Sequence, residues 1–212
     1  IVKIKSAGYL NTNTPLYECG VSGIFTKTLD IALLKGKIDI AVHSFKDVPT
    51  TPADGIKIDC VLKRESALDV LMLRREGIDY SQNLKIATSS IRRKCQWLYK
   101  YPNHKIAPLR GDIDTRIKKL MNGDYDAIIL SYAGVKHLKL EDKISEIFSV
   151  EEIIPSAGQG IIAIQCREND RDMISMLKKI NHKETYKRAH AERNILKVLE
   201  GDCETAVGIH SK

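Results

Sequence analysis

The chain has 212 residues, of which 43% are hydrophobic, 29% are charged and 6% are aromatic, and its formal net charge is +7. This composition is typical of a globular protein long enough for one large domain or two smaller ones. No apolar run approaches the roughly 20 residues that span a bilayer, so we expect no membrane partner. The positive charge favours an anionic partner. Nucleic acid, a membrane surface and a small acidic molecule would each fit this charge. Few aromatic side chains are available to stack on single-stranded nucleic acid and no recognition motif is found, so we expect no nucleic-acid partner.

The chain begins with residues 1–5, IVKIK, which resemble a strand. They lack an initiator Met and the apolar region of a signal peptide, so the chain is expected to be processed or to start partway through a longer protein. Helical spacing predicts a helix over residues 23–35, with Gly36 as its C-terminal stop. A buried strand is predicted over residues 38–43, and the following SFKDVP places Pro49 where neither strand nor helix continues easily.

The remaining pattern alternates between strands and helices, without repeats. Residues 64–66 are interpreted as one crossing between two lobes, and the loop-like residues 153–160 as a second. Two lobes joined by two crossings make a cleft, which is a common place for a small ligand. Further strands are expected at residues 56–62, 70–73, 84–87, 105–109, 127–130 and 161–166, and helices at 91–101, 113–121 and 170–199, the last broken at Asn181 and His182.

Two arginine-bearing segments follow strand patterns in the middle of the chain, TSSIRR at residues 88–93 and LRGDIDTR at residues 109–116. Their hydroxyl side chains stand where a helix N-terminus needs capping groups. Backbone N–H groups, hydroxyls and guanidinium groups can converge there on a carboxylate or phosphate. The alternative is a solvated helix start whose arginines point into water. Two such segments in one domain favour the anion site.

The five cysteines are far apart and odd in number: Cys19, Cys60, Cys95, Cys166 and Cys203. No pair has the spacing of metal ligands, and no disulfide framework is indicated. A reducing compartment is therefore expected, either the cytoplasm or an organelle reached after removal of a transit peptide. Four of the cysteines have the surroundings of small buried hydrophobic residues. Cys203 follows a turn-like Glu-Gly-Asp sequence, and an exposed thiol in a loop is a candidate for covalent chemistry.

Five segments occur in the same order as in the porphobilinogen deaminase (hydroxymethylbilane synthase) family, and the chain resembles that family over nearly its whole length. The segments are AVHSFKDVP at 41–49, TSSIRR at 88–93, LRGDIDTR at 109–116, PSAGQG at 155–160 and LEGDC at 199–203. The resemblance implies a transferase of haem biosynthesis that deaminates four porphobilinogen units and joins them into hydroxymethylbilane. It also implies a dipyrromethane primer attached to Cys203 by a thioether, and we expect a monomer with porphobilinogen as its partner.

The resemblance assigns roles to individual residues. Asp47 matches the catalytic carboxylate, which would hold the pyrrole N–H groups, assist loss of ammonia and stabilise a cationic azafulvene. The alternatives are that Asp47 caps a turn, that Lys46 is a solvent lysine and that Phe25 packs in the core. Positions that match cofactor-binding residues are Ser44, Lys46, Thr88, Ser90, Arg92, Arg93, Arg110, Arg116, Gln159 and Cys203. Positions that match substrate-binding residues are Phe25, Arg110, Arg116 and Gly134.

The expected fold is an α/β protein of two lobes with mixed sheets, like a periplasmic binding protein, followed by a truncated third α/β domain. The first lobe would use residues 1–61 and 160–180, the second residues 66–155, and the remnant with the cysteine loop residues 183–212. Some positions depart from the family pattern: Glu18 and Ser22 replace lysines, Asp112 and Asp114 replace Asn and Gly, and His137 replaces an arginine. Glu18, Asp112 and Asp114 favour an alternative, a two-lobed polycarboxylate-binding protein without turnover.

Overall fold

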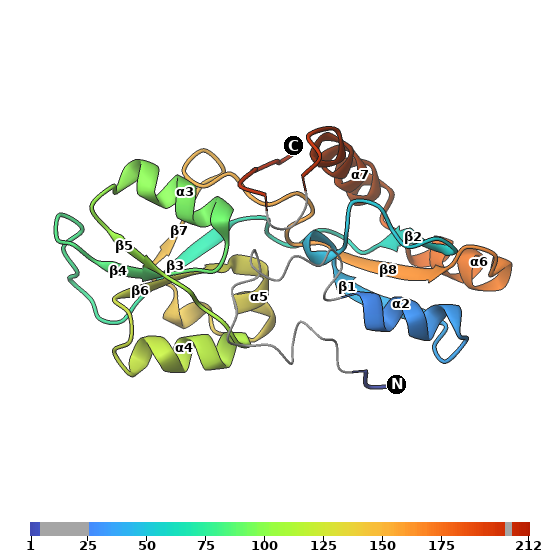
Figure 1. Ribbon diagram of the computed structural model, residues 1–212, viewed down its shortest axis with the longest axis horizontal. Coiled ribbons are helices and arrows are strands. Elements are labelled where there is room, and N and C mark those ends of the chain that lie inside the picture. Colours follow the sequence, from blue (N-terminus) through green and yellow to red (C-terminus); the bar gives the residue numbers. More distant parts are fainter. Residues whose placement is uncertain (5–25, 202–204) are drawn as a thin grey trace.

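The computed structural model describes residues 1–4, 26–201 and 205–212. The helices and strands form two lobes, each built around its own sheet (Figure 1). This confirms the expected α/β fold of two lobes. The three-stranded sheet contains, in order, β1 (Ile40–Ser44), β8 (Ile162–Arg167) and β2 (Ile56–Val61). The five-stranded sheet contains, in order, β5 (Lys105–Ala107), β4 (Lys85–Ala87), β6 (Ala127–Ser131), β3 (Asp69–Leu73) and β7 (Glu146–Ile147).

The first lobe is antiparallel, because β1 and β2 both pair with the central β8. Its helices are α2 (Lys27–Leu34), α6 (Arg171–Ile180) and α7 (Lys183–Val198). Gly36 follows α2 with a φ of +65°, which confirms it as the stop residue. Ala189 of α7 is buried with Phe45 and Val61, so α7 contributes to the core of the first lobe. The assignment of residues 183–212 to a third-domain remnant stays a prediction.

The second lobe has a mixed sheet covered on both faces. β4 runs parallel to β5 and β6, whereas β3 runs antiparallel to β6 and β7. The strands β3 and β6 are apolar without alternation, as expected of strands that are buried on both faces. One core cluster contains Trp97, and the other contains Ile117 and Leu120. The helices are α3 (Ile91–Lys100), α4 (Ile113–Met121) and α5 (Tyr132–His137), with the 3-10 turn η3 (Glu141–Lys143).

The strand directions bring the candidate site residues to facing edges of the two sheets. The parallel strands β4, β5 and β6 end at one edge of the second sheet, and β3 begins there, because Asp69 pairs with Ser131. In the first sheet Ser44 at the end of β1 pairs with Ile162 at the start of β8. Both crossings connect these edges: one runs from the end of β2 to the start of β3, and the other from the end of β7 to the start of β8. Ligands of open α/β sheets bind at such carboxyl ends, so the topology supports a site here.

The two crossings touch each other. The Glu65 N–H donates to the Gly160 carbonyl at 2.8 Å. Gly160 has a φ of +77°, and a Cβ there would lie 2.4 Å from the Ser66 carbonyl oxygen. A side chain is excluded at this position both by backbone conformation and by space.

Some expectations differ from the structure. The prediction of a strand at the N-terminus was wrong for residues 1–4, which pair with no described strand and leave Val2 62% exposed. An alternating pattern alone does not make a strand, since a strand needs hydrogen-bonded neighbours. The helix α5 and the strand β7 were not expected. Residues 131–134 were interpreted as the end of the strand that begins at Ala127, whereas Ser131 is the N-cap of α5. Within the described residues, no helix is long and apolar enough to cross a membrane.

Candidate functional site

The second residue of one arginine-bearing segment is hydrogen-bonded to the first residue of the other. The Ser89 hydroxyl donates to the Leu109 carbonyl at 2.8 Å, and the Leu109 N–H donates to the Ser89 oxygen at 2.9 Å. Ser90 is the N-cap of α3 and accepts from the Arg93 N–H, as the sequence predicted. Thr88 is buried, and its hydroxyl accepts from the Ser90 N–H at 3.2 Å. The segments therefore form one continuous site.

The arginines of α3 are buried rather than solvated. Arg93 donates to Asp69 Oδ1 through Nε at 3.1 Å and through Nη2 at 2.6 Å, and to the Ile129 carbonyl at 3.2 Å. Arg92 forms an ion pair with Asp69 Oδ2 at 2.8 Å and donates to the Ile154 carbonyl at 2.6 Å. The alternative in which these arginines point into water is therefore wrong. Their role in binding the cofactor stays a prediction.

Asp69 is the residue that the sequence reasoning missed. It is fully buried, which by itself would raise the pKa of its carboxyl, but the charges of Arg93 and Arg92 outweigh burial and lower that pKa to about 2. The signal in the sequence was a charged residue at the start of the apolar strand DVLML. A buried carboxylate needs paired cations, and Asp69 takes both from α3.

Gln159 and Lys46 continue this network toward the first lobe. Gln159 is fully buried and donates through Nε2 to the Ala67 carbonyl at 2.6 Å and to Asp69 Oδ1 at 2.8 Å. Its Oε1 accepts from Lys46 Nζ at 3.4 Å and from Arg93 Nη2 at 3.5 Å. Burial lowers the pKa of Lys46 to about 8, with Asp47 acting against this shift and Arg93 adding to it. Lys46 is therefore not a solvent lysine.

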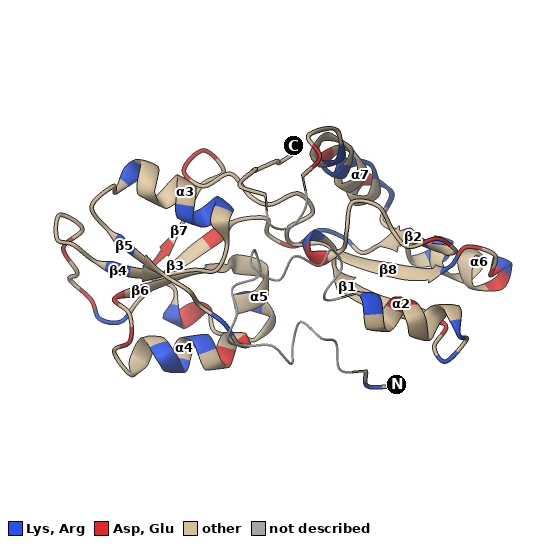
Figure 2. Ribbon diagram, in the orientation of Figure 1, with Lys and Arg blue, Asp and Glu red and all other residues tan. Residues whose placement is uncertain are grey.

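The arginines of the second segment lie at the start of α4. Arg116 is half-buried and donates through Nε to the Gly111 carbonyl at 2.8 Å. Burial lowers its pKa to about 10, the charges of Arg93 and Arg110 add to this effect, and Asp47 opposes it. Arg116 therefore interacts electrostatically with two neighbouring arginines and with the carboxylate of Asp47 in the other lobe. We call Lys46, Arg92, Arg93, Arg110 and Arg116 the cation cluster. Figure 2 shows basic residues at the end of α3 nearest the first lobe, and both acidic and basic residues along α4.

Asp47 belongs to a short 3-10 helix, η2 (Phe45–Asp47), that follows β1. Phe45 is buried and fixes this turn to the first lobe. The turn is closed by a backbone hydrogen bond from the Val48 N–H to the Phe45 carbonyl. Ser44 is exposed at its N-cap and makes no capping hydrogen bond. Asp47 is half-buried, and its charge acts on Lys46 and on Arg116. The catalytic role of Asp47 stays a prediction.

Of the remaining predicted site residues, the structure describes Gly134 but not Phe25 or Cys203. Gly134 lies in α5, where a Cβ would come within 2.8 Å of Ile113 Cδ1. It therefore allows α5 to pack closely against the start of α4, and its contact with substrate stays a prediction. Phe25 and Cys203 lie outside the described residues, as do Glu18 and Ser22.

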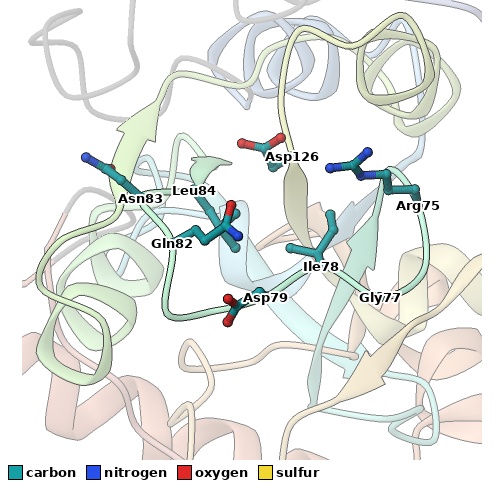
Figure 3. A pocket seen from close by; sticks show the side chains of 8 residues that line it. All are labelled: Arg75, Gly77, Ile78, Asp79, Gln82, Asn83, Leu84 and Asp126. Atoms are coloured by element: carbon teal, nitrogen blue, oxygen red, sulfur yellow. The ribbon is translucent and has the colours of Figure 1, made fainter.

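A separate hollow of about 210 Å³ lies at the opposite edge of the second sheet (Figure 3). It is formed by the connection between β3 and β4 and by the residue before β6. Its lining residues are Arg75, Gly77, Ile78, Asp79, Gln82, Asn83, Leu84 and Asp126. It shares no residue with the cation cluster, and its acidic and basic side chains are not those that the sequence singled out.

The chain is similar to known proteins over most or all of its length. A family model described as "Porphobilinogen deaminase, dipyromethane cofactor binding domain" matches residues 1–175. Similar curated proteins include the chloroplastic porphobilinogen deaminase of Oryza sativa subsp. japonica at 39% identity, and the porphobilinogen deaminases of Desulforamulus reducens at 39% and Ehrlichia chaffeensis at 42%. These alignments cover 100%, 100% and 97% of this chain, but 60%, 69% and 70% of the relatives.

Among solved structures, the probable amino-acid ABC transporter extracellular-binding protein ytmK from Bacillus subtilis has a TM-score of 0.45 at 14% identity. That comparison covers 82% of this chain and 75% of the other. The likeness is too weak to bear on function. The residues matched by the family model include the segments that carry the cation cluster. From its sequence and from these matches, the chain belongs to the porphobilinogen deaminase family.

Proposed function

We propose that the protein deaminates porphobilinogen and joins four units into hydroxymethylbilane. The observation that carries this proposal is the cation cluster around Asp47, contributed by both lobes at the facing sheet edges. Each pyrrole bears an acetate and a propionate, so a growing chain brings many carboxylates. The lowered pKa values of Lys46 and Arg116 reflect partly buried cations with too few carboxylates nearby, and an anionic ligand supplies them.

The residues present fit the dipyrromethane cofactor of this family. Arg110, Arg116 and Lys46 would hold its carboxylates, and Ser90 at the N-terminus of α3 would support the same anionic groups. When bound, this primer supplies the pyrrole carbon to which the first substrate unit is joined. We propose Cys203 for the thioether, because it stands in the matching LEGDC segment.

Asp47 has the chemistry required of the catalytic group. A carboxylate accepts hydrogen bonds from pyrrole N–H groups and stabilises the positive charge that develops on the ring as ammonia departs. The neighbouring cations Lys46 and Arg116 would hold the substrate carboxylates on either side of it. Fixed charges at the reacting ring stabilise the transition state without reorganisation, which is how the site would accelerate the reaction.

Two measurements on the full-length protein test this function. Its intact mass should exceed the chain mass by one dipyrromethane, and incubation with porphobilinogen should release ammonia and consume the substrate, which itself colours with Ehrlich's reagent. Cys203→Ser should lose both signals, and Asp47→Asn should keep the mass and lose turnover. Asp54→Asn, a change at an exposed position of the same lobe, serves as the control and should keep both. A bare chain mass after expression with excess porphobilinogen would contradict the proposal.

The alternative, a polycarboxylate-binding protein without turnover, predicts ligand binding with no release of ammonia. It drew support from Asp112 and Asp114 among the arginines. The Asp112 carboxylate accepts the Thr115 N–H at 2.8 Å as the N-cap of α4, and Asp114 is exposed. Asp112 therefore caps α4, and this structural role explains its presence without excluding catalysis.

We also propose that the protein acts as a monomer in the cytoplasm, or in an organelle after removal of a transit peptide. Relatives carry both bacterial and chloroplastic names, which is compatible with either compartment. Sedimentation at micromolar concentration tests the monomer, and a second species with twice the mass would contradict it.

A further inference from the structure

We propose that Asp69 is a positioning residue for the cation cluster: it orients Arg92, Arg93 and Gln159, and it supplies the negative charge that lets the Lys46 ammonium group lie beside two guanidinium groups. This inference extends the proposed function, and the role of Asp69 in substrate binding rests on that function. Asp69 was not among the residues that the family resemblance assigned.

The position of Asp69 is set by the fold. It is the first residue of β3, it pairs with Ser131 at the sheet edge where the crossings leave, and it is fully buried. Its carboxylate is in contact with Arg93 at 2.6 Å and Arg92 at 2.8 Å. An arginine held at two points of its guanidinium cannot rotate freely, so these contacts fix where the positive charge of α3 lies.

Asp69 also determines which way the Gln159 amide points. Gln159 Nε2 donates to Asp69 Oδ1 and to the Ala67 carbonyl, and both of these are acceptors only. The amide oxygen is therefore directed to the donors Lys46 and Arg93. A flipped amide would place its NH₂ group against two cations and its oxygen against two acceptors. The carboxylate on β3 thus reaches Lys46 on the other lobe through one side chain.

The charges around Lys46 show why the carboxylate is needed. Lys46 is faced by Asp47 on its own turn, by Arg92 and Arg93 on α3, and by Asp69 on β3. Burial lowers the pKa of Lys46 to about 8, and Asp69 acts against this shift. Without Asp69, two guanidinium charges would be opposed by Asp47 alone, and the pKa of Lys46 would fall further. A lysine without its proton cannot pair with a substrate carboxylate.

Competitive acetylation of Lys46 across a pH series, read by peptide mass spectrometry, tests this role without any turnover. The midpoint of Lys46 labelling is expected near pH 8 in the unaltered protein. In Asp69→Asn it should fall by about one pH unit, the size expected for the loss of one nearby charge. Asp69→Glu, which keeps the charge, should restore the midpoint. Asp126→Asn is the matched control: its carboxylate pairs with Arg74 at the opposite edge of the same sheet, and the midpoint should not move.

The sign of the shift separates positioning from a purely structural role. If Asp69 only held the fold together, its loss would expose Lys46, and the midpoint would rise toward that of a free lysine. A rise, or no change, in a folded Asp69→Asn variant would overturn the inference. Should that variant not fold, Asp69→Asn combined with Arg92→Gln removes one charge of each sign. Its midpoint should stay near pH 8, and a rise would overturn the inference equally.

Turnover adds a second readout. In Asp69→Asn the KM for porphobilinogen should increase more at pH 8 than at pH 6.5, because lower pH returns the proton to Lys46. An increase that is the same at both pH values would count against the inference. If the unaltered protein showed no turnover, the proposed function would fail, and the labelling result would still decide the role of Asp69.

Discussion

The arginines of α3 and those at the start of α4 belong to similar segments, yet they occupy different environments. Arg92 and Arg93 are buried and share the carboxylate of Asp69. Arg116 is half-buried, hydrogen-bonds to the Gly111 carbonyl and has the cations Arg93 and Arg110 as neighbours. The α3 pair therefore contributes to stability as well as to charge, whereas Arg116 is better placed to accept an anion. The following predictions test this division.

The largest effect is expected for Arg93→Leu. The change leaves the buried Asp69 carboxylate with one cationic partner in place of two, and breaking a buried ion pair costs about 3–5 kcal/mol of unfolding free energy. Arg116→Leu is the matched change in the other segment and should cost about 1 kcal/mol or less. Urea unfolding measures both. Equal losses would show that the two segments do not differ in this way.

Acid should lower the free energy of unfolding by protonating Asp69, the ion-pair partner of Arg92 and Arg93. The folded pKa of Asp69, about 2, lies below the ordinary value of 3.8, so its ionised form adds about 2 kcal/mol of stability above pH 3.8. This contribution is lost as the pH falls from about 3.8 to about 2. Urea unfolding of the unaltered protein and of Asp69→Asn should therefore converge over that range. A difference that stays constant with pH would contradict the assignment.

Arg116→Gln should affect ligand binding more than stability. Loss of one charge-assisted contact to a carboxylate should raise the KM for porphobilinogen about tenfold. Lys118→Gln, at an exposed position of the same helix, is the control and should change KM little. An unchanged KM in Arg116→Gln would remove this arginine from the binding site.

The smallest effect concerns pH. Because the pKa of Lys46 is about 8 and that of Arg116 about 10, affinity for porphobilinogen should fall severalfold between pH 7 and pH 9 through Lys46 alone. Lys46→Gln should bind more weakly and lose this pH dependence, whereas Arg116→Gln should keep it. Steady-state kinetics across this range would reveal a persistent alkaline decline in Lys46→Gln if another group were responsible.

Sequence reasoning identified β3 and β6 of the second lobe because residues 70–73 and 127–130 are continuous apolar runs between turns. It also placed Ser90 at a helix start, since a cap is a local property. The role of Asp69 was not accessible in this way. Its partners lie 23 and 24 positions away, on a helix that packs against the sheet, and only the fold shows that a charged residue is buried there. The role of Ser89 was equally inaccessible from the sequence, because its hydrogen-bond partner Leu109 lies twenty positions later.

The contact between the crossings has a consequence for mutational tolerance. Gly160 combines a left-handed backbone with a carbonyl at 2.4 Å from where a Cβ would lie. Gly36 has a similar φ but open space around it. A saturation library should therefore accept Asn or Asp at position 36, because these residues tolerate a positive φ, and glycine alone at position 160. Position 160, where the two crossings touch, should therefore tolerate less variation than position 36.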